Sequence, residues 1–323
     1  MIGRRIPLAA IIVVSSVLSM SALAQYPTRL VRIVTTSAPG TAPDLLARMV
    51  GTSLSQSLKQ TFIVETRTGA GGNVAADYVA KSVPDGYTLL VAPDPVFTTN
   101  PYLYKKPSFD ALKDLVPVAS IMSQAFALCV NLSVPAKTLP QFIEYARHAN
   151  PPLFYGSAGV GTSSHLSVEM LKARTGVNLV HMPFAGGGAP LMTALMRGEV
   201  AATIGGTAAL AQVKAGKLAA IATTGAKRSV HYPDLPAFAE TVPGYEVLTW
   251  LGMFSPAGTP TDVIARLNND IASFLALPDT RQKFAGMGGI DPLITKPEEF
   301  AALIRRDNEK YGKIIRQLGL SLE

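Results

Sequence analysis

The sequence is poor in cysteine, in charged residues and in aromatic side chains. Of its 323 residues, 16% are charged, 7% are aromatic, and Cys129 is the single cysteine. One cysteine excludes an intramolecular disulfide, so an exported chain of this kind folds on its hydrophobic core alone. Cys129 lies in the apolar run 126–130, which favours a small buried core residue over an activated thiol.

Several chemical patterns are also missing, and each absence excludes a class of function. No apolar run after residue 24 is long enough to cross a bilayer. Lysines and arginines are scattered and form no stripe between aromatics, which disfavours nucleic-acid binding. His148, His165, His181 and His231 lack metal-ligand spacing, and no phosphate loop or hydrolase elbow occurs. The sequence therefore predicts no metal, no cofactor and no catalytic residue, with an exported hydrolase as the least favoured alternative.

The first 24 residues have the pattern of a cleavable signal peptide. Arg4 and Arg5 form a charged start, 6–20 is almost wholly apolar, and Ala22-Leu23-Ala24 is a small-x-small cleavage site. We expect cleavage after Ala24 and export of the mature chain.

Apolar strand-like runs alternate with helical patterns along the rest of the chain. This alternation predicts an α/β protein with mainly parallel sheets flanked by helices. The last three helices have no strands of their own, which predicts two lobes, 25–125 plus 251–323 and 126–250, with a ligand cleft between them. Strands are predicted over 30–35, 62–65, 88–92, 116–121, 126–131, 153–155, 177–181, 200–204, 218–223 and 247–254, and helices over 43–58, 73–81, 138–148, 163–174, 188–197, 208–215, 260–276, 279–287 and 297–318.

Two segments combine a strand, a loop of glycine and hydroxyl residues, and a helix start. One is 154–165, with Ser163 or Ser164 as helix cap, and the other is 35–44, with Thr41 as cap. The first N–H groups of a helix lack internal partners and attract anions. Because 154–165 contains no lysine or arginine, N–H groups and hydroxyls would hold the charge, which suits a small carboxylate. Ordinary capping between inert elements remains the alternative for either loop.

Motifs in nearly every part of the chain then agree with one known family. The sequence resembles the Bug-type extracytoplasmic receptors of tripartite tricarboxylate transporters. The resemblance rests on Ala38-Pro39-Gly40 with Asp44, Gly69-Ala70-Gly71-Gly72, Pro84-Asp85-Gly86-Tyr87, Asn100-Pro101-x-Leu103-Tyr104, Gly159-x-Gly161-Thr162-x-x-His165, His181-Met182-Pro183-Phe184, Pro233-Asp234-Leu235-Pro236 and Trp250-x-Gly252.

The resemblance implies a monomeric periplasmic binding protein of the two-lobe, type II-like kind. Such a protein closes over a small di-, tri- or aromatic carboxylate and presents it to the membrane permease subunits of the transporter. The ligand-binding positions that the resemblance implies are Ser37, Ala38, Pro39, Gly40, Thr41, Asp44, Ser157, Gly159, Val160, Gly161, Thr162, Ser163, His165, Phe184, Gly205, Gly206 and Thr207.

One loop departs from the family pattern. The segment Gly205-Gly206-Thr207 lacks the acidic residue that is usual there, which removes a partner for an ammonium group. We therefore expect a plain aromatic or dicarboxylic acid in preference to an amino acid. Three questions stay open at this point: whether the partner is a permease or a membrane histidine kinase, whether Trp250 walls the ligand or packs at a hinge, and whether 69–72 contacts the ligand.

Overall fold

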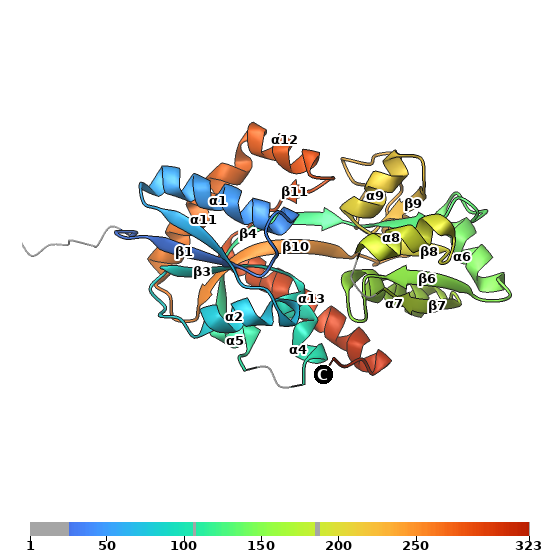
Figure 1. Ribbon diagram of the computed structural model, residues 1–323, viewed down its shortest axis with the longest axis horizontal. Helices are drawn as coiled ribbons and strands as arrows, with labels where there is room; N and C mark the ends of the chain where they lie inside the picture. Colours follow the sequence, from blue (N-terminus) through green and yellow to red (C-terminus); the bar gives the residue numbers. More distant parts are fainter. Residues whose placement is uncertain (1–25, 106–107, 185–187, 323) are drawn as a thin grey trace, which may run out of the picture.

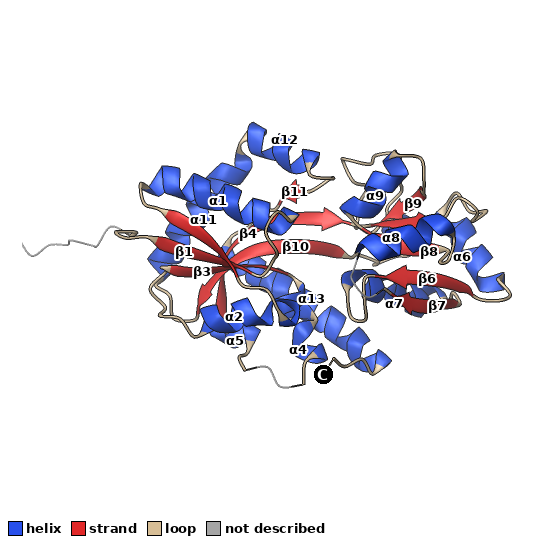
Figure 2. Ribbon diagram, in the orientation of Figure 1, coloured by secondary structure: helices blue, strands red, loops and turns tan. Residues whose placement is uncertain are grey.

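Two α/β units lie end to end along the long axis of the molecule (Figures 1 and 2). The computed structural model describes residues 26–105, 108–184 and 188–322, so the predicted signal peptide lies outside the described residues. The first unit contains β1 (Val31–Thr35), α1 (Ala42–Leu58), β2 (Phe62–Thr66), η2 (Ala70–Gly72), α2 (Asn73–Ala80), β3 (Thr88–Pro93), α3 (Pro95–Thr98), α4 (Asn100–Leu103), α5 (Ala111–Asp114) and β4 (Leu115–Ala125).

The chain then builds the second unit and returns to the first. The second unit contains β5 (Ala127–Val130), α6 (Leu139–His148), β6 (Leu153–Ser157), α7 (Ser163–Thr175), β7 (Leu179–Pro183), α8 (Gly188–Arg197), β8 (Ala202–Gly205), α9 (Thr207–Lys214), β9 (Ala219–Thr223) and α10 (Phe238–Thr241). The returning segment is β10 (Leu248–Pro256), α11 (Thr261–Ala276), α12 (Pro278–Gly286), β11 (Asp291–Pro292) and α13 (Pro297–Leu318).

The predicted strands and long helices are confirmed, with ends shifted by a few residues. The short helices α3, α4, α5 and α10 and the short strand β11 were not predicted, because four residues or fewer carry no readable periodicity. None of the described helices has both the length and the apolar character that crossing a membrane requires.

Both sheets are mixed, which corrects the prediction of mainly parallel sheets. The first sheet has the order β11-β4-β10-β3-β1-β2, and the second has the order β7-β6-β8-β5-β9. In the first, β1 pairs in parallel with β2 and β3, whereas β10 pairs antiparallel with β3 and β4. The reason is the double crossing: β4 carries the chain out, and β10 returns beside it in the opposite direction (Figure 1).

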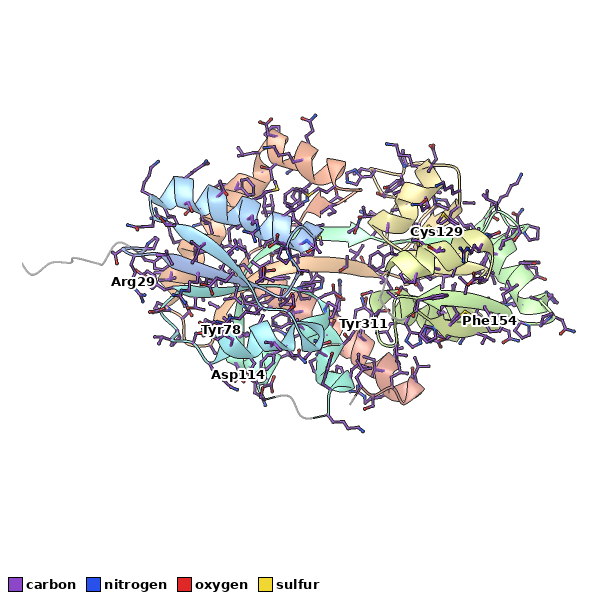
Figure 3. All side chains as sticks on the ribbon, viewed as in Figure 1. Arg29, Tyr78, Asp114, Cys129, Phe154 and Tyr311 are labelled. Atoms are coloured by element: carbon purple, nitrogen blue, oxygen red, sulfur yellow. The ribbon has the colours of Figure 1, made fainter. Side chains whose placement is uncertain are left out.

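The two units share part of one hydrophobic core. Leu103 on α4 and Tyr311 and Ile315 on α13 belong to the same buried cluster as Phe142, Leu166 and other residues of the second unit. Figure 3 shows Tyr311 at the junction of the two units, while Cys129 lies within the second. The final helix therefore packs against both units, on β4 in the first and on α7 in the second, and the division into lobes at residues 125 and 250 remains a prediction.

Hydrogen bonds to the backbone and hydroxyl of Thr224 join the two crossing segments where they enter the second unit. Thr224 donates its N–H to Phe126 O (2.8 Å) and its hydroxyl to Val247 O (2.6 Å). The Phe126 N–H donates to Thr224 Oγ1 (2.9 Å), and the Val247 N–H to Thr224 O (2.9 Å). One threonine thus holds both crossings at a fixed spacing.

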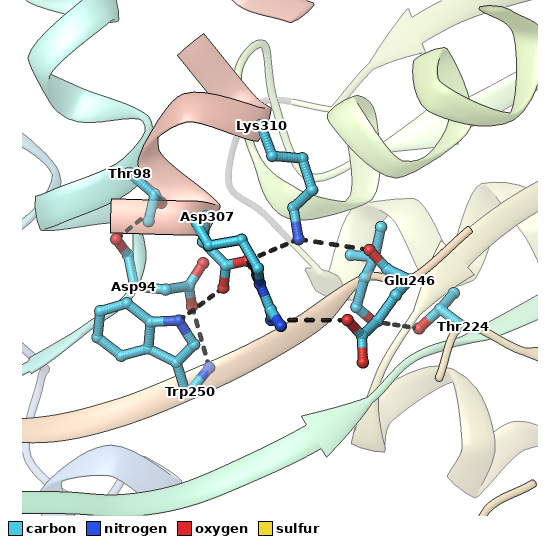
Figure 4. A network of polar contacts seen from close by, with 9 residues as sticks. Asp94, Thr98, Thr224, Glu246, Trp250, Asp307 and Lys310 are labelled. Carbon is cyan, nitrogen blue, oxygen red and sulfur yellow. Dashed lines mark hydrogen bonds and ion pairs between the residues drawn. The ribbon is translucent and has the colours of Figure 1, made fainter. Parts of the chain in front are cut away.

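A buried acid lies beside these crossings (Figure 4). The Asp94 side chain accepts from the Thr249 hydroxyl and from the Trp250 N–H (3.3 Å), while Trp250 Nε1 donates to Asp307 (3.1 Å). Burial raises the pKa of Asp94 to about 7, and the negative charge of Asp307 adds to that effect. Lys310 Nζ lies 2.8 Å from Asp307 and balances that second carboxylate.

We predict that Asp94→Asn makes the folded protein less sensitive to rising pH. Because the pKa of Asp94 is raised on folding, its contribution to stability is full below the unfolded pKa and is lost as pH rises through about 7. Asparagine keeps the acceptor oxygen and removes the ionisation. Urea unfolding at intervals between pH 4 and 8 should show that the free energy of unfolding of the variant rises relative to that of the wild type as pH rises. A difference in free energy that stays the same at every pH would contradict this prediction.

Gly252 on β10 permits the close approach of α13 to the sheet. A Cβ at this position would lie 2.4 Å from the Phe300 ring, and Phe300 is fully buried. Gly252→Val should therefore destabilise the fold by about 1–3 kcal/mol, the usual cost of overpacking. Gly286→Ala is the matched control, since a Cβ there meets nothing within 4 Å. Thermal melts in which both variants behave alike would refute this packing argument.

Candidate functional site

The loop between β1 and α1 is a tight turn held by a side chain of the helix that follows it. Gly40 has φ +80, a conformation that glycine adopts without strain. Its N–H donates to Asp44 Oδ2 (2.9 Å), and Thr41 Oγ1 donates to Ala38 O (2.7 Å). Thr41 occupies the N-cap position, as predicted, but its side chain makes no capping bond.

The loop between β6 and α7 repeats this turn in the second unit. Gly161 has φ +77, its N–H donates to His165 Nδ1 (3.0 Å), and Thr162 Oγ1 donates to Gly159 O (2.7 Å). Thr162 is the N-cap, which corrects the prediction of Ser163 or Ser164 in that position. Ser164 is used otherwise: its Oγ accepts from the Ala158 N–H (3.0 Å).

Both turns leave the first N–H groups of their helices without a protein partner. Within the described residues, no acceptor bonds the N–H groups of Ser163, Ser164 and His165 on α7, or of Ala42 and Asp44 on α1. The Ser163 side chain is half-buried, and the segment 38–41 is exposed. Such N–H groups carry the positive end of the helix dipole, so each turn can receive an anion.

Asp44 and His165 are buried, and their acceptor atoms are already occupied. Arg48 donates from Nε and Nη2 to the two carboxylate oxygens of Asp44, each at 3.0 Å, and this contact lowers the pKa of Asp44. Burial lowers the pKa of His165 to about 4, helped by the adjacent His181. At neutral pH, Asp44 is therefore ionised and the His165 ring is neutral. Each side chain accepts the hydrogen bond from the glycine N–H of its own turn.

His165 lies in a stack of rings behind the second turn. Its ring centroid is 3.9 Å from that of His181, which in turn lies 5.0 Å from that of Tyr155. Ser157 Oγ lies 2.6 Å from His181 Nε2 and also accepts from the Gly159 N–H (3.2 Å). Ser157 is fully buried with its hydrogen bonds made, so it braces the loop and is not presented as a nucleophile.

Close approaches link α4 to the loop 69–72 in the first unit and to the turn at Gly161 in the second. A Cβ on Gly72 would lie 3.1 Å from Thr36 Cβ, and one on Gly71 would lie 3.0 Å from the Tyr104 hydroxyl. A Cβ on Gly161 would lie 2.4 Å from Leu103 Cδ1. The loop 69–72 thus packs against the end of β1, and Leu103 packs against the second turn.

No local pattern assigns a role to Leu103, although it belongs to a motif of the family resemblance. Only the tertiary contact with Gly161 reveals its place. The same contact shows that a bulky residue at Gly161 would displace α4, and binding experiments are therefore better directed at Ser163.

The third predicted loop lies beside the crossing strands. Gln124 Nε2 donates to Thr207 Oγ1 (2.9 Å) and to Gly288 O (2.8 Å), while a Cβ on Gly206 would lie 3.0 Å from the Phe126 ring. Gln124 therefore ties this loop to the first unit, a role that no pattern in the sequence indicated. Gly205 precedes this contact at the end of β8 and is half-buried.

Two predicted aromatic positions differ in their surroundings. Phe184 is half-buried and packs toward Gly156, where its Cε2 would lie 3.2 Å from an added Cβ. The segment 185–187 that follows lies outside the described residues. Trp250 is 1% exposed and packs edge-on against Phe300, so it belongs to the core of the first unit. No group of three or more potential metal ligands occurs in the described part of the chain.

Comparison with known proteins agrees with this architecture. The family model described as "Tripartite tricarboxylate transporter family receptor" matches residues 46–320. The R. palustris protein Rpa4515, solved with adipate, is 34% identical with a TM-score of 0.78, and the match covers 92% of this chain and 100% of that one.

Two further solved structures are similar over most of their length. The periplasmic binding protein BugD is 30% identical with a TM-score of 0.73, covering 92% of this chain and 100% of that one. MatC from Rhodopseudomonas palustris, with bound malate, is 29% identical with a TM-score of 0.71, covering 90% of this chain and 100% of that one. The resemblance seen in the sequence motifs is confirmed. The chain belongs to the family of tripartite tricarboxylate transporter receptors, in its Bug-type branch.

Proposed function

We propose that this protein captures a small carboxylate between its two lobes and delivers it to the permease subunits of a tripartite tricarboxylate transporter. The observation that supports this most is the repeated turn: each unit begins a helix with bare N–H groups next to an exposed or half-buried hydroxyl. Membership in a receptor family, and the adipate and malate in two of its relatives, agree with an acidic ligand.

The proposed ligand contacts come from the two turns and the loop beside Gln124. The first turn offers Ser37 to Thr41, the second Gly159 to Ser163, and the third loop Gly205 to Thr207. Ser157 is buried and braces the second turn from behind, and Phe184, whose N–H donates to Ser157 O (3.0 Å), lies beside that turn. Neither turn contains a lysine or arginine, and Arg48 is held by Asp44. Hydrogen bonds from N–H groups to a carboxylate are charge-assisted, so they give useful affinity without a buried cation.

The absence of an acidic residue in 205–207 supports a ligand without an ammonium group. We therefore propose a dicarboxylic or aromatic acid in preference to an amino acid. The adipate in a relative that is 34% identical favours the dicarboxylate of the two.

We further propose that residues 1–24 direct export to the periplasm, with cleavage after Ala24, and that the mature chain is a monomer. Its lobes would be 25–125 plus 251–323 and 126–250. Like other receptors of its family, it would carry no catalytic residue and no cofactor.

A thermal-shift screen tests the ligand class. Adipate, malate, citrate and benzoate should be compared with aspartate at equal concentration. A ligand present at a hundred times its Kd adds about 2.7 kcal/mol to the free energy of unfolding. We expect a clear rise in Tm with at least one plain carboxylate and none with aspartate. A response to aspartate alone would contradict the proposed class.

A charge placed at the second turn tests the location of the site. Ser163→Asp puts a carboxylate at the first residue of α7, where it should stabilise the helix by about 0.3–1 kcal/mol while repelling an anionic ligand. We expect the affinity for the active carboxylate to fall by at least about tenfold with no loss of Tm.

Thr261→Asp is the matched control, because Thr261 is the first residue of α11 and lies beside Val116 and Lys296. It should leave the affinity, measured by calorimetry, unchanged. If Ser163→Asp binds the carboxylate as tightly as the wild type does, the second turn is not part of the ligand site.

A further inference from the structure

We infer that Asp44 and His165 are equivalent positioning residues, which hold the two turns in the form that binds the ligand and do not touch the ligand themselves. The inference rests on the proposed function, because it assigns roles within the same site. It also separates two residues from the set of ligand contacts that the family resemblance implies.

The first argument is that the two turns agree atom for atom in their hydrogen bonds. Each has a glycine of φ near +80, and each threonine hydroxyl donates to the carbonyl three residues before it. Each threonine O accepts from the N–H four residues later, at 2.9 Å in both turns. The glycine N–H meets a side chain four residues later in both cases, although one is a carboxylate and the other an imidazole.

The second argument concerns the chemistry that the two side chains share. A carboxylate and a neutral imidazole have little in common except an acceptor atom that can reach the glycine N–H. A residue that gripped an anionic ligand directly would have to donate. Asp44 cannot donate in its ionised form, and the His165 Nδ1 that accepts from the Gly161 N–H cannot hold an anion either. The proton of His165 is then on Nε2, and the ¹⁵N shift of that atom reports whether its N–H meets the ligand.

The third argument is that the surroundings of His165 keep it neutral and fixed. It is 4% exposed and packs against His181 from β7 and Tyr155 from β6. Glu169 and Lys172 on α7 are the charged groups that act on it, and they pair with each other at 2.7 Å. Tyr245 reaches the same helix from the second crossing and donates to Ser167 O (2.8 Å).

Two parts of each turn therefore have different roles. The side chain at the third helical position satisfies the glycine N–H, so the turn is fixed before a ligand arrives. The N–H groups of the first helical residues are left for the ligand. Fixing the turn in advance lowers the entropy that binding must overcome.

Two substitutions at one position separate the acceptor from the ring. His165→Asn keeps an acceptor within reach of the Gly161 N–H and loses the stack on His181. His165→Phe keeps a ring that can stack and loses the acceptor. By calorimetry with the active carboxylate, we expect His165→Asn to bind within about threefold of the wild type. We expect His165→Phe to bind at least about tenfold more weakly, as loss of a buried hydrogen bond implies.

The first turn supplies the parallel pair. Asp44→Asn keeps the acceptor for the Gly40 N–H, whereas Asp44→Leu removes it, and the same ranking of affinities is expected. Arg266→Met is the control, because it removes an ion pair of the same spacing, with Asp270 on the exposed side of α11, a helix that carries none of the proposed ligand contacts. It should bind as the wild type does.

A spectroscopic measurement on the wild type tests the inference even where a variant fails to fold. The ¹⁵N shifts of the His165 ring should report an unprotonated Nδ1 and a protonated Nε2 at pH 7, and they should stay in place when ligand is added. A ring shift that moves on binding would overturn the inference, as would His165→Phe binding at full strength. If no carboxylate binds the wild type, the proposed function fails instead, and the turn geometry is untouched.

Discussion

The whole arrangement depends on one hydrogen bond made twice, from a glycine N–H to a side chain one helical turn ahead. The bond lets the chain leave a strand, reverse sharply and enter a helix with its first amides unused. The side chains packed behind each turn preserve this bond. Arg48 holds Asp44 in its charged form, and the rings of His181 and Tyr155 hold His165 in its neutral form. A carboxylate and a neutral imidazole therefore support the same backbone geometry. The turn requires an acceptor atom at this position and not a particular residue type.

The scaffold connects the two units by covalent and noncovalent means. The strands β4 and β10 cross between the units, and Thr224 spaces them with four hydrogen bonds. On one side of the crossings, Leu103 lies against Gly161; on the other, Gln124 joins Thr207 to Gly288. The buried pair of Asp94 and Asp307 adds a polar layer beside the same strands, where Trp250 bridges them. Apolar packing and neutral hydrogen bonds therefore carry most of the connection between the two units.

Much of the fold and part of the site could be predicted from the sequence. Alternating apolar runs located the strands and long helices, and glycine-hydroxyl loops located both turns. Strand direction could not be predicted, because the local pattern of β10 is the same whichever way it runs. A motif shows that a residue lies near a site but not which atom it faces, so the ligand contacts that the resemblance implies for Asp44 and His165 stay predictions beside the positioning role that we propose. The spacing Gly-Thr-x-x followed by an acceptor occurs in both loops and was the readable signal. Leu103 and Gln124 act only through partners distant in the chain, so no local pattern could reveal them.

The last helix limits how the two units can move. α13 is one continuous rod whose early residues, such as Phe300, lie in the core of the first unit, while Tyr311 and Ile315 lie in that of the second. A hinge movement at the crossing strands alone would pull α13 away from one of these two cores. A relative movement of the two units would therefore have to shift or bend this helix as well as the crossing strands. Gly312 lies in this segment, where an added Cβ would come within 2.3 Å of the Tyr102 ring, and glycine is a poor helix former. The carboxyl-terminal helix thus couples the two units at a second place, apart from the crossing strands.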